Sequence, residues 1–167
     1  MLGRLFRQES GAAAAEMAMV APLLIIIMFG SMEIGHYFYS EHVVVKAVRD
    51  GARFAARQSF ANYTCPGATI GGTVVINTQR LTRTNTVDGS GIPRLADWTN
   101  DASVTVTPGC VPNSSGTYVT AYADGLGDIP TVTVTAVVPY TSLFSVIGFN
   151  SVNLKLRATE QAVVMGI

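Results

Sequence analysis

Hydrophobic side chains are unevenly distributed along the chain, and three patterns follow one another. From Ala12 to Met32 the sequence is an apolar run of 21 residues in which Glu16 is the only ionisable side chain. Residues 34–58 have apolar positions at three-, four- and seven-residue steps, the spacing of an amphipathic helix. From Ser59 onward, short segments alternate Thr and Val with the period of two that is typical of strands. The order predicts one long helix followed by a small sheet.

The apolar run is long enough to cross a membrane. About 20 residues at 1.5 Å per residue span a hydrocarbon core of ~30 Å, so we predict a transmembrane helix over residues 12–33. Arg4 and Arg7 precede it, and the positive-inside rule then places the N-terminus in the cytoplasm and the rest of the chain outside it.

Three other interpretations of this run compete. A cleaved secretory signal is disfavoured because no A-x-A-like site follows Gly30. A buried core helix is disfavoured by the length of the run. A plain uncleaved anchor remains open, but it gives Glu16 no purpose. A carboxylate costs about 2.5–3.5 kcal/mol at mid-membrane and less near the end of a span, so such a residue usually has a partner or a task.

The amphipathic segment continues the helix, so Ala12–Gln58 is predicted as one helix. One face carries apolar residues and the opposite face carries basic ones: Ile34, Phe38, Val45, Val48, Ala52 and Ala55 against His42, Lys46, Arg49, Arg53 and Arg57. The basic face is interpreted as solvated, and His36 and His42 are too far apart around the helix to form a metal pair.

Small residues recur every four positions in this segment, at Ala47, Gly51 and Ala55. Such a strip lets another backbone approach closely. The strip packs either against the protein's own domain or against another subunit, and both alternatives stay open.

The C-terminal two thirds predict an antiparallel sheet of three or four strands, at residues 102–108, 117–124, 131–140 and 151–163. Residues 72–81 favour a short helix over a strand. Residues 62–72 and 82–100 are predicted as loops because of their Gly, Pro and Asn content, and residues 141–150 as a turn with a short helix. The predicted fold class is α+β, with the long helix packed on the sheet.

Cys65 and Cys110 both lie in this part. Outside the cytoplasm disulfides persist. A bond between these two cysteines would lower the entropy of the unfolded chain and so stabilise the domain by about 3–4 kcal/mol. We predict a structural disulfide, with two free thiols as the alternative.

Composition narrows the possible functions. The formal net charge is zero, which gives no reason to expect nucleic-acid binding, and the low charged fraction of 13% with a mean hydropathy of +0.35 favours a membrane-anchored chain. No catalytic motif, phosphate loop or metal-ligand spacing is present, so neither an enzyme nor a cofactor is expected. The DGLGD segment at 124–128 lacks the ligand alternation of a calcium loop.

The N-terminal residues resemble a known family. A short basic leader, Gly11, and a glutamate five residues later are similar to the processing site of type IV prepilins. The wider segment resembles the TadE-like minor pilins, or pseudopilins, of the tight-adherence (Flp-type) pilus. The family pattern is matched by Pro22, Gly30, Glu33, Gly35 and the stretch Val48–Arg53, whereas Met17 departs from the usual Phe or Tyr.

This resemblance implies a division of the chain and a role. Residues 1–11 would be a cytoplasmic leader, cut between Gly11 and Ala12 by a prepilin peptidase, and Glu16 would act in assembly. Residues 12–33 would span the bacterial inner membrane, residues 34–58 would extend the helix, and residues 59–167 would form a pilin-like domain in the periplasm or at the surface. The implied partners are the major pilin, other minor pilins, the inner-membrane assembly platform and the lipid bilayer.

We therefore expect a minor pilin or pseudopilin that acts in pilus assembly or initiation, and hence in adhesion. The alternative is a membrane-anchored extracytoplasmic domain that binds a partner without polymerising. An enzyme is the third hypothesis. Only the first hypothesis gives both Gly11 and Glu16 a use.

Overall fold

The computed structural model describes residues 5–113, 128–145, 148, 151 and 153–166. The chain divides into two compact parts. The anchor unit comprises Met1–Phe38 with Ser142–Asn150, and the sheet unit comprises Tyr39–Thr141 with Ser151–Ile167.

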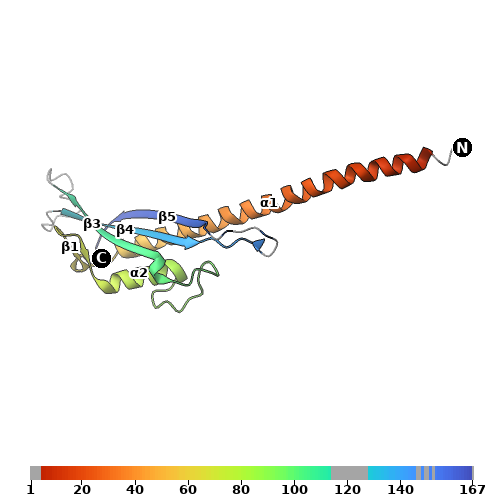
Figure 1. Cartoon of the computed structure of the whole chain (residues 1–167). Helices are drawn as coiled ribbons and strands as arrows, with labels where there is room; N and C mark the ends of the chain where they lie inside the picture. Colours follow the sequence, from red (N-terminus) through yellow and green to blue (C-terminus); the bar gives the residue numbers. More distant parts are fainter. Residues whose placement is uncertain (1–4, 114–127, 146–147, 149–150, 152, 167) are drawn as a thin grey trace. The chain divides into compact units, whose positions relative to one another are not determined.

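One long helix, α1 (Leu5–Ala56), supplies the helical part of the anchor unit and the first element of the sheet unit (Figure 1). The prediction of a single long helix is confirmed, although α1 begins within the proposed leader and ends two residues before Gln58. Pro22 lies inside the helix. A proline removes one backbone hydrogen bond, and membrane helices tolerate this more often than soluble ones.

The sheet unit contains a three-stranded antiparallel sheet in the order β3 (Val104–Pro112), β4 (Asp128–Pro139), β5 (Lys155–Val163). These strands correspond to three of the four predicted strands, and the fourth prediction, residues 117–124, lies outside the described residues. The fold class α+β is confirmed.

The alternation of Thr and Val in β4 separates two faces of the sheet. Val132, Val134, Ala136 and Val138 are fully buried, whereas Thr133 and Thr135 are partly exposed on the other face. Thr159 of β5 lies opposite Thr135, and the hydroxyl oxygens of the two residues are 3.0 Å apart. Because β4 is the central strand, this alternation fixes the register of both its neighbours.

The second half of α1 packs in the core of the sheet unit. Its buried residues are Ser40, Val44, Ala47, Val48, Gly51, Ala52, Ala55 and Ala56. Figure 1 shows this half of the helix running alongside the sheet, and Arg49 reaches Glu160 of β5 at 3.8 Å. On the predicted apolar face, Val48, Ala52 and Ala55 are buried, whereas Ile34 and Phe38 are more than half exposed.

A second helix, α2 (Gly72–Thr84), confirms the helix preferred for residues 72–81 and lies beside β3. The Gln79 side chain donates to the Val104 carbonyl at 2.8 Å. The helix ends where Asn85 adopts the left-handed conformation, a common C-terminal cap.

Short elements complete the unit. The 3-10 turns η2 (Phe60–Asn62) and η3 (Asp101–Ser103) precede strands, and β1 (Tyr63–Thr64) pairs with β2 (Thr69–Ile70). The prediction of a plain loop over residues 62–72 is therefore wrong for this hairpin. Two-residue strands are too short to give a periodic signal.

The end of α1 is closed by groups distant in the sequence. The Tyr63 hydroxyl donates to the Ala55 carbonyl at 2.6 Å, and the Met165 N–H donates to the Ala56 carbonyl at 2.8 Å. The last carbonyls of a helix have no partner within the helix. The first bond therefore ties β1 to the end of α1, and the second ties the C-terminal end of the sheet unit to it.

Candidate functional site

The candidate site is the exposed N-terminal half of α1, in the anchor unit. Its most hydrophobic window has a mean hydropathy of 2.2, and none of that window is buried within the protein. The five consecutive residues from Leu23 to Ile27 are each more than half exposed. The length and composition of this helix are those of a membrane span, and so many bare apolar side chains require an apolar environment from outside the chain.

Gly11, Ala12 and Glu16 lie together near the start of this exposed stretch. All three are exposed, and a Cβ added at Gly11 would meet open space. Within the described part of the chain, no ion pair or hydrogen bond to the Glu16 carboxylate is present. No described residue thus crowds the missing side chain of Gly11, and Glu16 is available to a partner.

Glu33 has a partner that sequence reasoning missed. Its carboxylate accepts a hydrogen bond from the backbone N–H of Leu143 at 3.2 Å. The adjacent residue, Phe144, meets Phe29 edge-on, with ring centroids 4.9 Å apart. The glutamate of the Gly30–Gly35 patch therefore holds a segment 110 positions away in the sequence.

The stretch Val48–Arg53 has a different use, inside the sheet unit. Asp50 forms an ion pair with Arg94 at 2.8 Å, and the same guanidinium nitrogen donates to the Asn85 side chain. Gly51 lies against α2, where an added Cβ would come within 2.1 Å of the Thr82 hydroxyl. This stretch therefore positions α2 and the loop that follows it.

The strip of small residues lies in the same place. Ala47 and Ala55 are completely buried and Gly51 is buried against α2 of the same chain. Of the two alternatives for this strip, the structure contains the packing within the protein's own domain.

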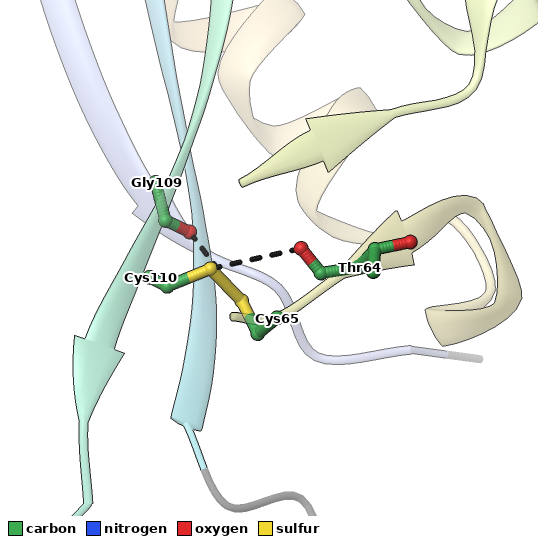
Figure 2. The surroundings of a disulfide bond; sticks show 4 residues. All are labelled: Thr64, Cys65, Gly109 and Cys110. Atoms are coloured by element: carbon green, nitrogen blue, oxygen red, sulfur yellow. Dashed lines mark hydrogen bonds between the residues drawn. A yellow bond between two sulfur atoms is a disulfide. The ribbon is translucent and has the colours of Figure 1, made fainter. Parts of the chain in front are cut away.

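Cys65 and Cys110 form a disulfide with a Cα–Cα distance of 5.9 Å. Figure 2 shows it joining the turn after β1 to β3, with the Cys110 sulfur 3.7 Å from the Thr64 carbonyl oxygen. The disulfide fastens the β1–β2 hairpin to the edge of the main sheet.

No group of three His, Cys, Asp or Glu side chains that could hold a metal ion occurs among the described residues. The sheet unit does have a hollow of about 340 Å³ beside the buried Trp98, bordered by Asn100, Pro139 and Lys155. Trp98 itself is held by a hydrogen bond from its ring N–H to the Ser103 hydroxyl at 2.6 Å. The residues bordering the hollow include no nucleophile paired with a base.

Comparison with known proteins finds a similarity in the N-terminal segment. Residues 11–53 match the model of the family described as TadE-like protein. Over this segment the chain is similar to TadE-like proteins. No curated protein and no solved structure matches the chain.

The matched segment includes both the exposed part and the buried part of α1. It begins at Gly11, includes Glu16 and Glu33, and ends at Arg53 in the stretch that packs on α2. It therefore combines an exposed apolar helix with the part of α1 that organises the sheet unit.

Proposed function

We propose that this protein is a minor pilin or pseudopilin of a tight-adherence pilus, cleaved after Gly11 by a prepilin peptidase. The observation that carries the proposal is the exposed carboxylate of Glu16, five residues beyond a glycine, at the start of an exposed apolar helix. The TadE-like match over the same residues supports an association with that pilus system.

Cleavage would supply the cation that Glu16 lacks. A cut between Gly11 and Ala12 frees an amino group on Ala12, with a pKa near 8 in water. It lies about one helical turn from Glu16. A carboxylate in apolar surroundings is tolerable when it is paired with a cation, and this amine, from the same subunit or the next one, meets that need.

Pairing between subunits would also fix their axial stagger. Only one register of two packed helices brings the amine and the carboxylate together. The uncleaved precursor has no amine at this position, so cleavage would be the condition for assembly.

Gly11 suits the cleavage site for two reasons. A helix with glycine at an interior position is less stable by about 1 kcal/mol than one with alanine there, so the helix opens more easily at Gly11. The missing side chain also lets a peptidase approach the backbone closely.

The proposed topology follows from the same segment. The N-terminus lies in the cytoplasm, α1 crosses the bacterial inner membrane, and the sheet unit lies on the periplasmic or extracellular side. Its partners would be the major pilin, other minor pilins and the inner-membrane assembly platform, and it would have no catalytic activity of its own.

The first test is processing. When the protein is coexpressed with its prepilin peptidase, intact mass should show loss of residues 1–11 and a new N-terminus at Ala12. A mature N-terminus beyond Gly30 would instead establish a secretory signal.

The second test is assembly. Glu16→Ala and Glu16→Gln should still insert and be cleaved, but should fail to crosslink to the major pilin or to appear in sheared pili. Glu16→Gln keeps the shape and removes the charge, and Met17→Phe is the matched control expected to assemble. Wild-type recovery of both Glu16 variants would favour the alternative of an anchored domain that does not polymerise.

A further inference from the structure

The segment between β4 and β5 turns back onto α1 within the anchor unit. The Leu143 N–H donates to Glu33, and the Phe144 N–H donates to the Ser142 hydroxyl at 3.1 Å. The Phe144 ring packs edge-on against Phe29, with an interplanar angle of 75°. We call residues Ser142–Phe144 the docked turn.

The docked turn meets α1 where the apolar run ends. Phe29 is the last large apolar residue before Gly30, and Glu33 follows one helical turn later. Tyr37, Phe38 and Tyr39 come next, and aromatic residues of this kind gather at the boundary between membrane and water. The docked turn therefore lies at the level where the hydrocarbon core of a bilayer would give way to the headgroups.

We infer that the docked turn is a second membrane contact, with Leu143 and Phe144 entering the outer edge of the same bilayer that α1 crosses. The inference rests on the membrane anchoring in the proposed function. Leu143 is 52% exposed, and Met28 and Met32, which flank Phe29 and Glu33 in the sequence of α1, are 52% and 53% exposed. These side chains continue the apolar surface of the span beyond the helix itself.

The backbone of the docked turn is suited to an apolar environment. A non-helical segment can enter a bilayer only where its polar backbone groups have partners. The N–H groups of Leu143 and Phe144 both have one, supplied by the side chains of Glu33 and Ser142. The sequence also contains no Asp, Glu, Lys, Arg or His between Asp128 and Lys155, so no charge opposes insertion.

Glu33 is then a positioning residue. Its carboxylate fixes the height of the docked turn on α1, and the Phe29–Phe144 contact supports it. A glutamine at this position could still accept the Leu143 N–H, whereas an alanine could not.

The experiment measures depth in the membrane. The full-length protein is reconstituted at low protein-to-lipid ratio in phosphatidylcholine–phosphatidylglycerol vesicles, with one cysteine carrying an environment-sensitive fluorophore. Lipids spin-labelled near the headgroup quench fluorophores in the bilayer, and iodide quenches those in water. The labelled variants are Leu143→Cys, Met28→Cys as the positive control, and Arg53→Cys, an exposed position in the sheet unit, as the negative control.

We expect the label at Leu143 to be quenched by lipid as strongly as that at Met28 and several times more than that at Arg53. Glu33→Ala should remove most of the lipid quenching at Leu143 and leave Met28 unchanged, and Glu33→Gln should retain it. This split separates positioning by the hydrogen bond from a general effect of Glu33 on folding.

Three outcomes would overturn the inference. Iodide quenching at Leu143 with lipid quenching at Met28 means that the turn lies in water although the anchor is inserted. Shielding from both quenchers means that a protein surface, such as a second copy, covers the turn. Absence of lipid quenching at Met28 removes the membrane anchoring itself, and the proposed function would fail with it.

Discussion

Two stretches of α1 are both apolar, yet they differ in what surrounds them. The residues from Leu23 to Ile27 are large, and 51–65% of each remains exposed. Val44, Ala47 and Val48 are smaller and at most 1% exposed. One stretch has its apolar partner inside the chain, whereas among the described residues the other has the docked turn near its end.

Both stretches are apolar, so apolarity alone does not distinguish their surroundings. The size of the side chains does distinguish them. Large, unbroken aliphatic runs suit lipid, which adapts to any shape. Small residues at four-residue spacing suit a fixed protein backbone that approaches closely, and α2 makes that approach at Gly51. The two stretches should therefore respond differently to the same substitution.

An aspartate introduced into each stretch gives the largest expected effects, in opposite directions. Ile26→Asp should weaken membrane insertion by about 3–4 kcal/mol, since it replaces a favourable residue with a charge at mid-span. It should leave the thermal unfolding of the sheet unit unchanged. Val44→Asp should do the reverse, because an unpaired buried charge costs several kcal/mol.

Carbonate extraction and thermal unfolding in detergent check the two halves of this prediction. Met19→Asp, near the existing carboxylate at the start of the span, is a control expected to affect insertion less. Loss of domain stability in Ile26→Asp would mean that the two stretches are not independent.

The disulfide joins two residues of the sheet unit, so its removal tests the stability of that unit separately from membrane insertion. Replacing Cys65 and Cys110 by serine should lower the free energy of unfolding by about 3–4 kcal/mol and leave insertion unchanged. Denaturant titration of both proteins in the same detergent measures the difference. Equal midpoints would show that the β1–β2 hairpin is held to the sheet by other contacts.

Gly51 tests the close approach directly. In Gly51→Ala the new Cβ would lie 2.1 Å from the Thr82 hydroxyl, which is buried and donates to the Thr78 carbonyl. We expect a loss of about 1–3 kcal/mol, the usual cost of overpacking. Adding Thr82→Ala should recover part of it by removing the clashing atoms. A stable single variant would mean that α1 and α2 can separate without cost.

The periodic parts of the fold could be predicted from the sequence. The 3.6-residue and two-residue patterns locate α1, α2 and the three main strands because those elements are long enough to repeat. On the predicted apolar face, Val48 is buried, whereas Ile34 and Phe38 are more than half exposed. A helical pattern shows which residues share one face of the helix. It does not show at which residue the packing of that face against the rest of the protein begins.

The contacts of the candidate site were much less predictable. Gly11 and Glu16 are recognisable because their spacing is local. The hydrogen bonds that Arg94 donates to Asp50 and Leu143 donates to Glu33 join residues 44 and 110 positions apart. No local sequence pattern reveals contacts over such separations. The sequence does contain a long charge-free stretch before Lys155, but its strand and turn patterns do not show what it contacts.

Tyr63 gives the smallest expected effect and tests how the buried half of α1 ends. Its hydroxyl donates to the Ala55 carbonyl, and burial raises the pKa of the phenol to about 12, against about 10 in an unfolded chain. Below pH 10 the phenol is neutral in both states, and its contribution to stability is complete. As the pH rises from 10 to 12 the unfolded state ionises first, so the folded state loses stability, by about 1–2 kcal/mol after allowance for local opening.

Tyr63→Phe should be less stable at neutral pH by about 1 kcal/mol, the value of the lost hydrogen bond. Its unfolding free energy should then fall less steeply between pH 10 and 12 than that of the wild type, as measured by denaturant titration at each pH in detergent. Parallel pH profiles for the two proteins would place the Tyr63 hydroxyl in water, and the Ala55 carbonyl would then keep the bond from the Gln58 N–H.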